Sequence, residues 1–522
     1  MAKRANLVNL DAMIKRADFA TKADDESSFD TVPNVSLRDF TQGGFIGPSL
    51  RKPDFQRETN HWTPQQVLSL LECFTSGDLI PSVILWKSPS YLFVIDGGHR
   101  LSVLKAWIED DYGDGPVSFK FFGHEISDEQ KKTADKARKL VNDKIGSWKH
   151  FQTKLEDEDL PAKERGQITT IVTRGLPIQW VKGDADKAES SFFKINTEGT
   201  PLDAIEELLL KSRKKPISIA ARAIIRAGKG HKYWSSFNES KAKEIESISH
   251  NFHSILFDPE IKRPIKTLDL PLGGSKGVRT ALQVLLDFML IANRDDKGLP
   301  KDVYGHDDDV TGDLTIGVLK NSLKLAQRIT GNDRGSLGLH PAVFFYGPSG
   351  KHSGPMFMGT VVLFGKKISN NDKEFFKKFT RIRSKLEDTL IQNKDLIATI
   401  LQKHISTKRV TSYTNLLDNI INRLDAGDVV NESDLVKYSD LQGKIVLGSV
   451  KNASKSFSED SKSAAFITTA LTSSIKCPIC NGYIDAEKSV SYDHIERVRE
   501  NGKGNTENCQ LTHPYCNQSV KQ

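Results

Sequence analysis

The stretch CPICNGYIDAEKSVSYDHIERVRENGKGNTENCQLTHPYCN, residues 477–517, holds four of the five cysteines of this 522-residue chain. Two pairs of metal-binding residues enclose it: Cys477 and Cys480 at one end, His513 and Cys516 at the other. Thiolate and imidazole groups at this spacing are typical of tetrahedral zinc, and four protein ligands close the shell, so that the ion holds structure without reacting. A segment this small buries little apolar surface, and bound zinc would supply the missing stability. The stretch therefore predicts a module stapled by structural Zn²⁺.

The cysteines also indicate the compartment. Clustered cysteines in a chain without a signal-peptide pattern favour metal binding in a reducing cytoplasm over disulfides. Cys509 occupies a position that suits an apolar core residue, and we leave it out of the predicted zinc shell. The most apolar helical stretch, residues 281–292, is short and interrupted by Asp287, which predicts a buried helix and no membrane partner. The net charge of +7 favours a polyanionic partner only weakly.

Asp493 and His494 lie between the two zinc pairs, in the segment SYDHIERV, residues 491–498. Adjacent residues of a strand point to opposite faces, so one side chain can bind an ion while the other activates a water. An imidazole titrates near neutral pH and suits a general base, whereas a carboxylate oxygen suits a hard cation such as Mg²⁺. The alternative is an Asx-type turn with a surface histidine, which is the commoner origin of an isolated Asp-His pair.

The order of these residues resembles the HNH endonuclease family, whose ββα-metal core reads Asp-His, a Gly/Asn-rich loop, then Asn and Leu, then Cys-Asn. The matching positions are Asp493, His494, Ile495, residues 502–505, Asn508, Leu511, Cys516 and Asn517. The resemblance implies hydrolysis of DNA phosphodiesters, with His494 as general base and Asn508 holding the loop that orients it. It also implies Mg²⁺ or another divalent cation on Asp493 and Asn517, where the ion would stabilise the scissile phosphate and the leaving group.

The sequence departs from this family at His513, where a third knuckle cysteine is usual. A literal alignment would place His513 with His494 and Asn508 in the catalytic set and leave zinc with three ligands. We assign His513 to zinc because its spacing from Cys516 repeats that of the first cysteine pair, and because Asn517 then occupies the last metal-ligand position of the family. A further alternative keeps the zinc fold and drops catalysis, which leaves a module that only binds DNA.

A second group of signals centres on VIDGGHRLSVL, residues 94–104. An apolar strand, two glycines and a helix bring backbone amides and the positive end of a helix dipole to a place where phosphate can bind. Arg100 can direct two donors to phosphate oxygens, and Asp96 can hold a magnesium ion or a ribose hydroxyl. The alternative is a strand-to-helix turn with a surface arginine, in which Asp96 caps the helix. Around this turn we predict helices at 63–77 and 101–108 and strands at 82–86 and 92–96.

The segments PDFQRETNHW, LIPSVILW and VIDGGHRLSVL together resemble the ParB/sulfiredoxin-like nucleotidase domain of GmrSD-type restriction enzymes and of phosphorothioate-sensing SspE-like proteins. The resemblance implies a mixed α/β domain that binds a nucleoside triphosphate (NTP). The residues that it places at the nucleotide are Gln56, Arg57, Asp96, Gly97, Gly98, His99 and Arg100. The family usually has two glutamines in place of Gly98 and His99, so we expect slow hydrolysis or nucleotide sensing alone. A later strand element of the family matches at Asn196, Gly199 and Leu202, which predicts a strand near 191–196.

The chain as a whole is predicted to be an α+β multidomain protein. Its expected parts are a leader at 1–34, the nucleotide-binding domain at 35–216, a mostly helical middle domain at 217–440, a linker and lead-in helix at 441–474, and the HNH domain at 475–522. The clearest helix of the middle domain is predicted at 372–404. The Ser/Lys-rich stretch 448–465 is typical of a flexible tether.

Both resemblances together imply a cytoplasmic, metal-dependent endonuclease gated by a nucleotide or by modified DNA, in bacterial defence against phage. Gating is expected because an uncontrolled nuclease would damage its host. DNA and a nucleotide are the expected partners, and a homo-oligomer is left open. Two alternatives remain: a ParB-like, nucleotide-switched DNA-binding protein with a non-catalytic zinc module, and a nuclease whose front domain only contacts DNA.

Overall fold

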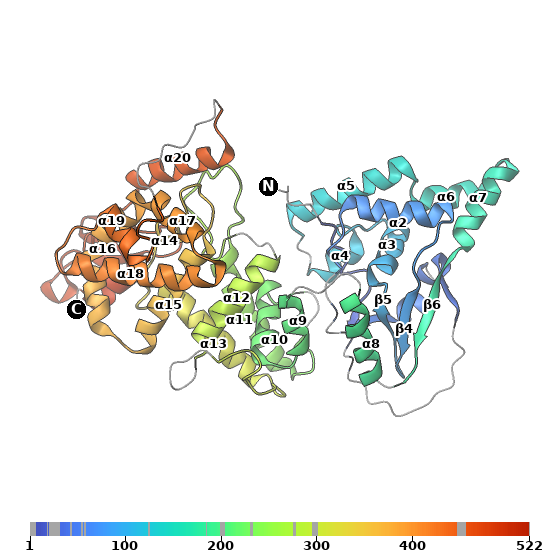
Figure 1. The fold of residues 1–522 in the computed structure, drawn as a ribbon, viewed down its shortest axis with the longest axis horizontal. Coiled ribbons are helices and arrows are strands. Elements are labelled where there is room, and N and C mark those ends of the chain that lie inside the picture. Colours follow the sequence, from blue (N-terminus) through green and yellow to red (C-terminus); the bar gives the residue numbers. More distant parts are fainter. Residues whose placement is uncertain are drawn as a thin grey trace. The chain divides into compact units, whose positions relative to one another are not determined.

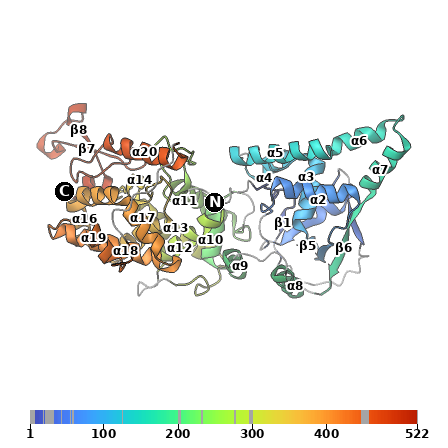
Figure 2. The same ribbon diagram turned by 45° about the horizontal axis from the view of Figure 1, so that its top comes forward.

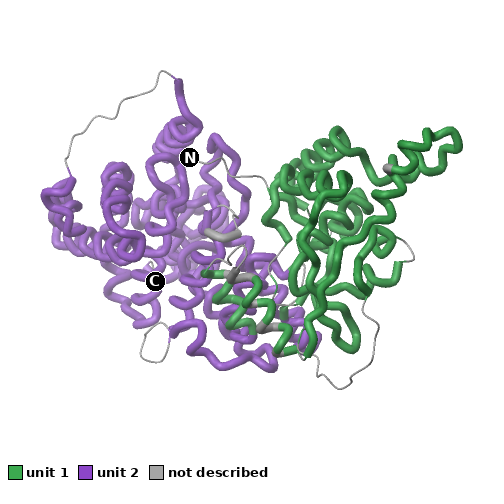
Figure 3. Tube along the Cα trace, turned by 45° about the vertical axis from the view of Figure 1, so that its right-hand side comes forward, with its two compact units in different colours: residues 1–213, 229–233 green, residues 214–228, 234–522 purple. Residues whose placement is uncertain are grey.

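The computed structural model describes residues 7–17, 19, 32–41, 44–53, 56, 59–123, 126–183, 185–198, 204–229, 233–274, 278–294, 301–445 and 456–520. The chain divides into two compact units (Figure 3), unit 1 with residues 1–213 and 229–233, and unit 2 with residues 214–228 and 234–522. Unit 1 contains the large sheet and unit 2 is chiefly helical, which confirms the α+β class. None of the helices in these ranges combines the length and apolar character that a membrane span requires.

Unit 1 is built on a six-stranded sheet with the strand order β1-β3-β5-β4-β6-β2. The strands are β1 (Arg16–Ala17), β2 (Asn34–Ser36), β3 (Leu50–Pro53), β4 (Val83–Lys87), β5 (Leu92–Asp96) and β6 (Gly175–Val181). β1, β3 and β5 run parallel, β4 is antiparallel to β5 and parallel to β6, and β2 is antiparallel to β6. The predicted strands at 82–86 and 92–96 are thus confirmed as β4 and β5.

Helices cover both faces of this sheet, with α2, α3 and α5 on one side and α8 on the other (Figure 1). The helices of unit 1 are α1 (Ile46–Ser49), α2 (Pro64–Ser76), α3 (Gly98–Glu109), α4 (Pro116–Phe121), α5 (Asp128–Lys144), α6 (Trp148–Glu156), α7 (Ala162–Thr173), α8 (Ala185–Glu198) and α9 (Ala204–Lys211). The two helices predicted beside the glycine turn are confirmed as α2 and α3. Thr63 and Gln66 form the capping box at the start of α2, and Gly77 ends it with φ 86°.

Two elements of unit 1 differ from the sequence prediction. The strand predicted near 191–196 is wrong, because this segment belongs to helix α8. Ala188 and Phe192 are buried one helical turn apart against Trp86 and Phe93 of the sheet, and that burial requires helical periodicity. The sequence prediction also missed β6, which pairs along β4.

Unit 2 joins a layered helical body to the cysteine-rich segment. Its helices are α10 (Pro216–Ile225), α11 (Glu239–Phe257), α12 (Val278–Ala292), α13 (Asp313–Ile329), α14 (Pro341–Phe344), α15 (Gly354–Ser369), α16 (Lys373–Gln392), α17 (Lys394–Lys403), α18 (Arg409–Asp425), α19 (Glu432–Tyr438) and α20 (Glu459–Thr472). The buried helix predicted at 281–292 is confirmed as part of α12. The five-part division of the chain stays a prediction.

Two corrections apply to unit 2. The single helix predicted at 372–404 is two helices, because Asn393 leaves helical geometry and its side-chain amide donates to the carbonyl of Thr389. The tether predicted at 448–465 ends in helix α20, in which Ser463, Ile467 and Leu471 are buried at helical spacing. Residues 448–455 of the predicted tether lie outside the described residues.

Candidate metal centre and active site

The structure brings Cys477, Cys480, His513 and Cys516 together, with their ligand atoms all within 4.8 Å of one another and all four residues buried. Nδ1 of His513 is 3.4 Å from Sγ of Cys480 and 3.9 Å from Sγ of Cys516. In a tetrahedral zinc site, the bond lengths to sulfur and nitrogen place such atoms roughly 3.6 Å apart. The four residues therefore fit Zn²⁺. Cys509 is exposed outside this cluster, and the apolar core position expected for it is wrong.

The surroundings of His513 prepare its ring for a metal. Its Nε2 donates to the backbone carbonyl of Tyr483 at 2.9 Å, which leaves Nδ1 facing the sulfur atoms. Burial lowers the pKa of His513, so the ring is neutral and Nδ1 keeps the lone pair that a metal ligand needs. This geometry supports the assignment of His513 to zinc rather than to catalysis.

A buried ion pair on α16 holds the first knuckle. Nε of Arg383 donates to Glu387 at 2.8 Å, and both side chains are almost completely buried. The other oxygen of Glu387 accepts the backbone N–H of Tyr483 at 2.7 Å, while Arg383 donates to the carbonyls of Leu337 and Gly338. The knuckle is therefore fixed to the helical body.

The second half of the zinc module is joined to the loop between α13 and α14. Ser489 donates to the carbonyl of Gly331, the backbone N–H of Val490 donates to Asn332, and the backbone N–H of Tyr515 donates to the carbonyl of Ser336. The zinc module and this loop consequently form one packed structure.

We expect Cys480→Ser to remove zinc and to unfold residues 475–520 locally. Structural zinc supplies roughly 10–16 kcal/mol of folding free energy in small zinc modules. Zinc content by atomic spectroscopy should fall from one ion per chain to none, and hydrogen exchange in 475–520 should accelerate while unit 1 stays protected. Cys509→Ser is the matched control, since that exposed thiol lies outside the cluster and should leave both readouts unchanged. Full zinc content in Cys480→Ser would contradict the assignment.

Asp493 and His494 end strand β7 (Ser491–His494), which pairs antiparallel with β8 (Cys509–Thr512), and Figure 2 shows both strands near the C terminus. Asp493 is buried, and one of its oxygens accepts from the side-chain amide of Gln510 at 2.8 Å. His494 is the next residue of the strand, so its side chain leaves from the opposite face, where it is half-buried. The strand thus separates a carboxylate from an imidazole, as the sequence predicts. Because Asp493 is fixed within regular strand pairing, the alternative of an Asx turn does not describe it.

Asn508 fixes the loop that follows His494. Its Oδ1 accepts the backbone N–H of Glu496 at 2.7 Å, and its Nδ2 donates to the carbonyls of Glu496 and Lys503 at 3.0 and 2.8 Å. Its own carbonyl accepts the backbone N–H of Ile495 at 2.9 Å. One side chain therefore closes both ends of the loop after His494, which agrees with the positioning role implied for Asn508.

Asn517 lies on the single helical turn η5 (Cys516–Val520), after β8, which completes a β-β-helix order. Its Nδ2 donates to the hydroxyl of Ser491 at 2.9 Å and to the carbonyl of Tyr492 at 3.2 Å. These bonds attach the amide to the strand that carries Asp493, and they leave Oδ1 as the atom that can receive a cation. Asp493 and Asn517 therefore provide oxygen donors of the type that Mg²⁺ prefers.

The predicted nucleotide residues gather at the start of α3. Gly97 is the N-cap with φ 94°, and a Cβ atom there would lie 3.0 Å from Val83, so both the conformation and the space require glycine. Gly98 faces the side chain of Gln56. His99 stacks on Trp62 with ring centroids 5.3 Å apart. The helix start thus carries two buried glycines beside Gln56, His99 and Trp62.

Arg100 is held in place at this helix start. Its Nη2 donates to Asp96 at 2.7 Å and to the carbonyl of Ser82 at 3.1 Å, so Asp96 pairs with Arg100 instead of capping α3. Within the described residues, Nε of Arg100 and Oε1 of Gln56 are buried without a hydrogen-bond partner. Buried polar atoms of this kind need a hydrogen-bond partner, which an ordered water or a bound ligand would supply. Arg57, Gly199 and Leu202 lie outside the described residues, and nothing is described of the side chain of Asn196.

Sequence reasoning missed several residues that support these sites. Gln510 lies directly across the strand pair from Asp493, so the pairing of 491–494 with 509–512 would have identified it. Arg383 and Glu387 lie about a hundred residues before the zinc ligands, and their spacing of four resembles that of any exposed helical ion pair. No local signal distinguishes them.

Comparison with known protein families matches both ends of the chain. Residues 37–213 match the model described as the GmrSD restriction endonuclease N-terminal domain, and residues 477–522 match the model described as HNH endonuclease. No curated protein and no solved structure gave a match. The matches support a nuclease of the restriction type, for which DNA is the partner. The chain therefore joins a GmrSD-type N-terminal domain to a C-terminal HNH endonuclease domain.

Proposed function

We propose that the protein is a metal-dependent DNA endonuclease in which a nucleotide bound to unit 1 controls the HNH module of unit 2. The single observation that carries the nuclease is the junction of β7 and η5. There the carboxylate of Asp493 and the amide of Asn517 are held by hydrogen bonds, and the imidazole of His494 leaves the same strand from its other face.

The proposed reaction assigns a separate task to each residue. His494 accepts a proton from the attacking water, because a neutral imidazole is a suitable base near pH 7. Asn508 keeps the loop after His494 in one conformation. Asp493 and Asn517 would hold a divalent cation, and a bound cation would offset the negative charge that develops on the phosphate.

Conversion of supercoiled plasmid to nicked or linear DNA tests this function. Wild-type protein with Mg²⁺ should cut, and protein with EDTA should not. Asp493→Asn keeps the size of the side chain but removes its charge, and it should slow cutting by roughly 100-fold or more, since a bound metal contributes several kcal/mol to such reactions. Binding without cutting under every condition would favour the alternative of a nucleotide-switched DNA-binding protein.

The nucleotide site is proposed at Gln56, Arg57 and residues 96–100. The buried Nε–H of Arg100, without a partner at the start of α3, supports an anionic group of the ligand, and the buried Oε1 of Gln56 would accept a hydrogen bond from a hydroxyl or amino group of the same ligand. Gly98→Ala is a sharp probe: the new Cβ would meet Gln56 at an ordinary 3.7 Å, so the fold is kept while the approach of a phosphate is blocked. We expect this variant to weaken NTP binding and phosphate release by at least roughly tenfold, as for loss of one charge-assisted contact. Equal NTP binding by wild type and variant would contradict the site.

The biological setting is proposed to be defence against phage. It is supported by the match to a restriction endonuclease family and by the need to restrain an HNH nuclease inside its host. Purified protein should be incubated with modified and unmodified phage DNA, with and without each NTP. Gating predicts that cutting depends on the nucleotide, on the DNA modification, or on both. Equal cutting under all conditions would leave a nuclease whose front domain only contacts DNA.

A further inference from the structure

A large groove lies in unit 2, and Cys480 is the one residue of the sites assigned so far that lines it. It has a volume of about 1810 Å³ and is lined by α13, α15, α16, the first zinc knuckle and η5. Sites for small molecules usually have volumes of about 300–1,000 Å³, so this groove is large for a single nucleotide. Its size favours an extended ligand.

The charge of the lining is strongly one-sided. Four basic residues come from one row of α16: Lys373, Lys377, Arg381 and Lys385. Four more come from other segments: Arg294, Lys324, Arg328 and Arg334. Asp333 is the acidic residue among the lining residues. Such an excess of positive charge selects a polyanion.

The row on α16 has a regular spacing. Its members are four residues apart, which places successive cations about 6 Å apart along the helix. This repeat resembles the separation of successive phosphates along a nucleic-acid strand. Lys377 pairs with Glu374 in an exposed and therefore weak ion pair, and Arg381 pairs with Asp425, but both cations remain about two-thirds exposed.

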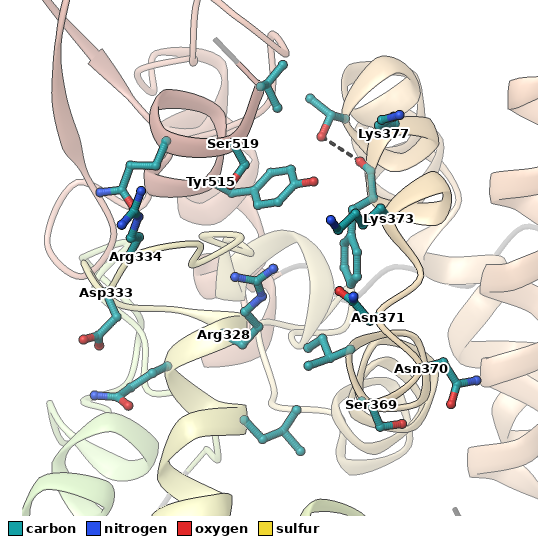
Figure 4. Close-up of a pocket in the computed structure, with 18 of the residues that line it drawn as sticks. Arg328, Asp333, Arg334, Ser369, Asn370, Asn371, Lys373, Lys377, Tyr515 and Ser519 are labelled. Carbon is teal, nitrogen blue, oxygen red and sulfur yellow. Dashed lines mark hydrogen bonds between the residues drawn. The ribbon is translucent and has the colours of Figure 1, made fainter. Parts of the chain in front are cut away.

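Partly buried arginines lie deeper in the groove. Figure 4 shows Arg328 and Tyr515 between Arg334 on one side and Lys373 and Lys377 on the other. The guanidinium of Arg328 lies over the rings of Phe376 and Tyr515, and within the described residues its Nε is buried without a hydrogen-bond partner. Burial lowers the pKa of Arg328, which means that the charged form lacks full solvation. A bound phosphate would supply the missing counter-charge.

The groove adjoins the candidate active site through η5. Gln518, Ser519 and Val520 of this turn line the groove, while Asn517 of the same turn bonds to strand β7 beside Asp493. A ligand in the groove therefore lies against the turn that carries a candidate metal ligand.

We propose that this groove binds the phosphate backbone of the DNA that the HNH module cuts, independently of unit 1. The inference deepens the proposed nuclease function and rests on it for the choice of DNA. The groove contributes affinity without reading bases, because its contacts are cations that meet phosphates.

The test measures DNA binding of the full chain carrying His494→Ala, in EDTA, by fluorescence anisotropy of a labelled duplex at several salt concentrations. The groove variant combines Lys373→Gln, Lys377→Gln, Arg381→Gln and Lys385→Gln. The control combines Lys243→Gln, Lys403→Gln, Lys408→Gln and Lys437→Gln, which remove the same charge from exposed positions of unit 2 outside the groove. Inorganic phosphate and ATP binding are measured in parallel.

We expect the groove variant to bind DNA roughly 10- to 100-fold more weakly at 0.15 M salt, with a salt slope smaller by about 3 to 4, while the control matches the parent. Equal slopes in the two variants would overturn the proposal, as would a loss of phosphate or ATP binding with DNA binding intact. If the groove variant fails to bind DNA and wild type does not cut with Mg²⁺, the result supports the DNA-binding groove and contradicts the proposed nuclease function. If wild type cuts and the groove variant binds DNA as tightly as its parent, the result supports the nuclease function and contradicts the DNA-binding groove.

Discussion

Replacing His494 with alanine should lower the rate of DNA cleavage by roughly 10²- to 10⁴-fold, the range that a positioned general base contributes. His494 is half-buried at the end of β7, and the loop after it is held by Asn508. DNA affinity should stay within twofold of wild type, because the groove on α16 is intact. The substitution should therefore lower the rate of phosphodiester cleavage and leave DNA binding nearly unchanged.

Single-turnover cleavage of a labelled duplex with Mg²⁺ separates these quantities. His250→Ala serves as control, because His250 is an exposed histidine on α11 of the same unit, and it should cut like wild type. Added imidazole should restore part of the activity to His494→Ala and none to Asp493→Asn. Unchanged cleavage in His494→Ala would remove the histidine from the mechanism.

Replacing Glu387 with alanine should destabilise unit 2 by about 3–5 kcal/mol, since it leaves the fully buried guanidinium of Arg383 without its carboxylate. The same change also leaves the backbone N–H of Tyr483 without its acceptor. The backbone carbonyl of Tyr483 accepts from Nε2 of the zinc ligand His513, so a shift of Tyr483 would also disturb the orientation of that ring. We therefore expect lower zinc retention under mild chelation, together with a lower melting temperature.

The matched control lies on the same helix. Glu374→Ala breaks an exposed pair with Lys377, and because exposed ion pairs contribute little, the melting temperature should stay close to that of wild type. The double variant Arg383→Met with Glu387→Leu removes the unpaired buried charge and should recover part of the lost stability, but not all, because the N–H of Tyr483 and the carbonyls of Leu337 and Gly338 lose their partners. For each variant, hydrogen exchange is measured in peptides from α16 and from residues 477–483, so that the stability of unit 2 is determined separately from that of unit 1. Equal stability of Glu387→Ala and Glu374→Ala would show that the buried pair does not anchor the knuckle.

The zinc pairs and the helix start at Gly97 were predictable because their signals are local, whereas the two strands of the zinc module were implied only by the resemblance to HNH endonucleases. Metal-ligand spacing, a glycine that must adopt positive φ, and the order of Asp493 before Asn508 can all be read within a few tens of residues. The match to two domain types agrees with the fusion that these residues implied.

Other features depended on contacts that a sequence does not display. Phe192 suits a strand as well as a helix, and only the face of the sheet that it covers decides for α8. Arg383–Glu387 and the exposed pair Lys243–Glu239 have the same spacing on a helix, yet one is buried against the zinc knuckle and the other faces solvent. The basic groove was missed because its lining residues come from five separate segments.

The attachment of the zinc knuckle to α16 affects whether the zinc module can be transferred from one protein to another. Tyr483, Ser489 and Tyr515 all donate hydrogen bonds to the helical body, and residues 475–522 alone would lose these three bonds. We therefore expect a fragment that begins near residue 456 to be less stable than the same residues within unit 2. A chimaera that receives an active nuclease module should therefore need residues 331–392 together with residues 475–522.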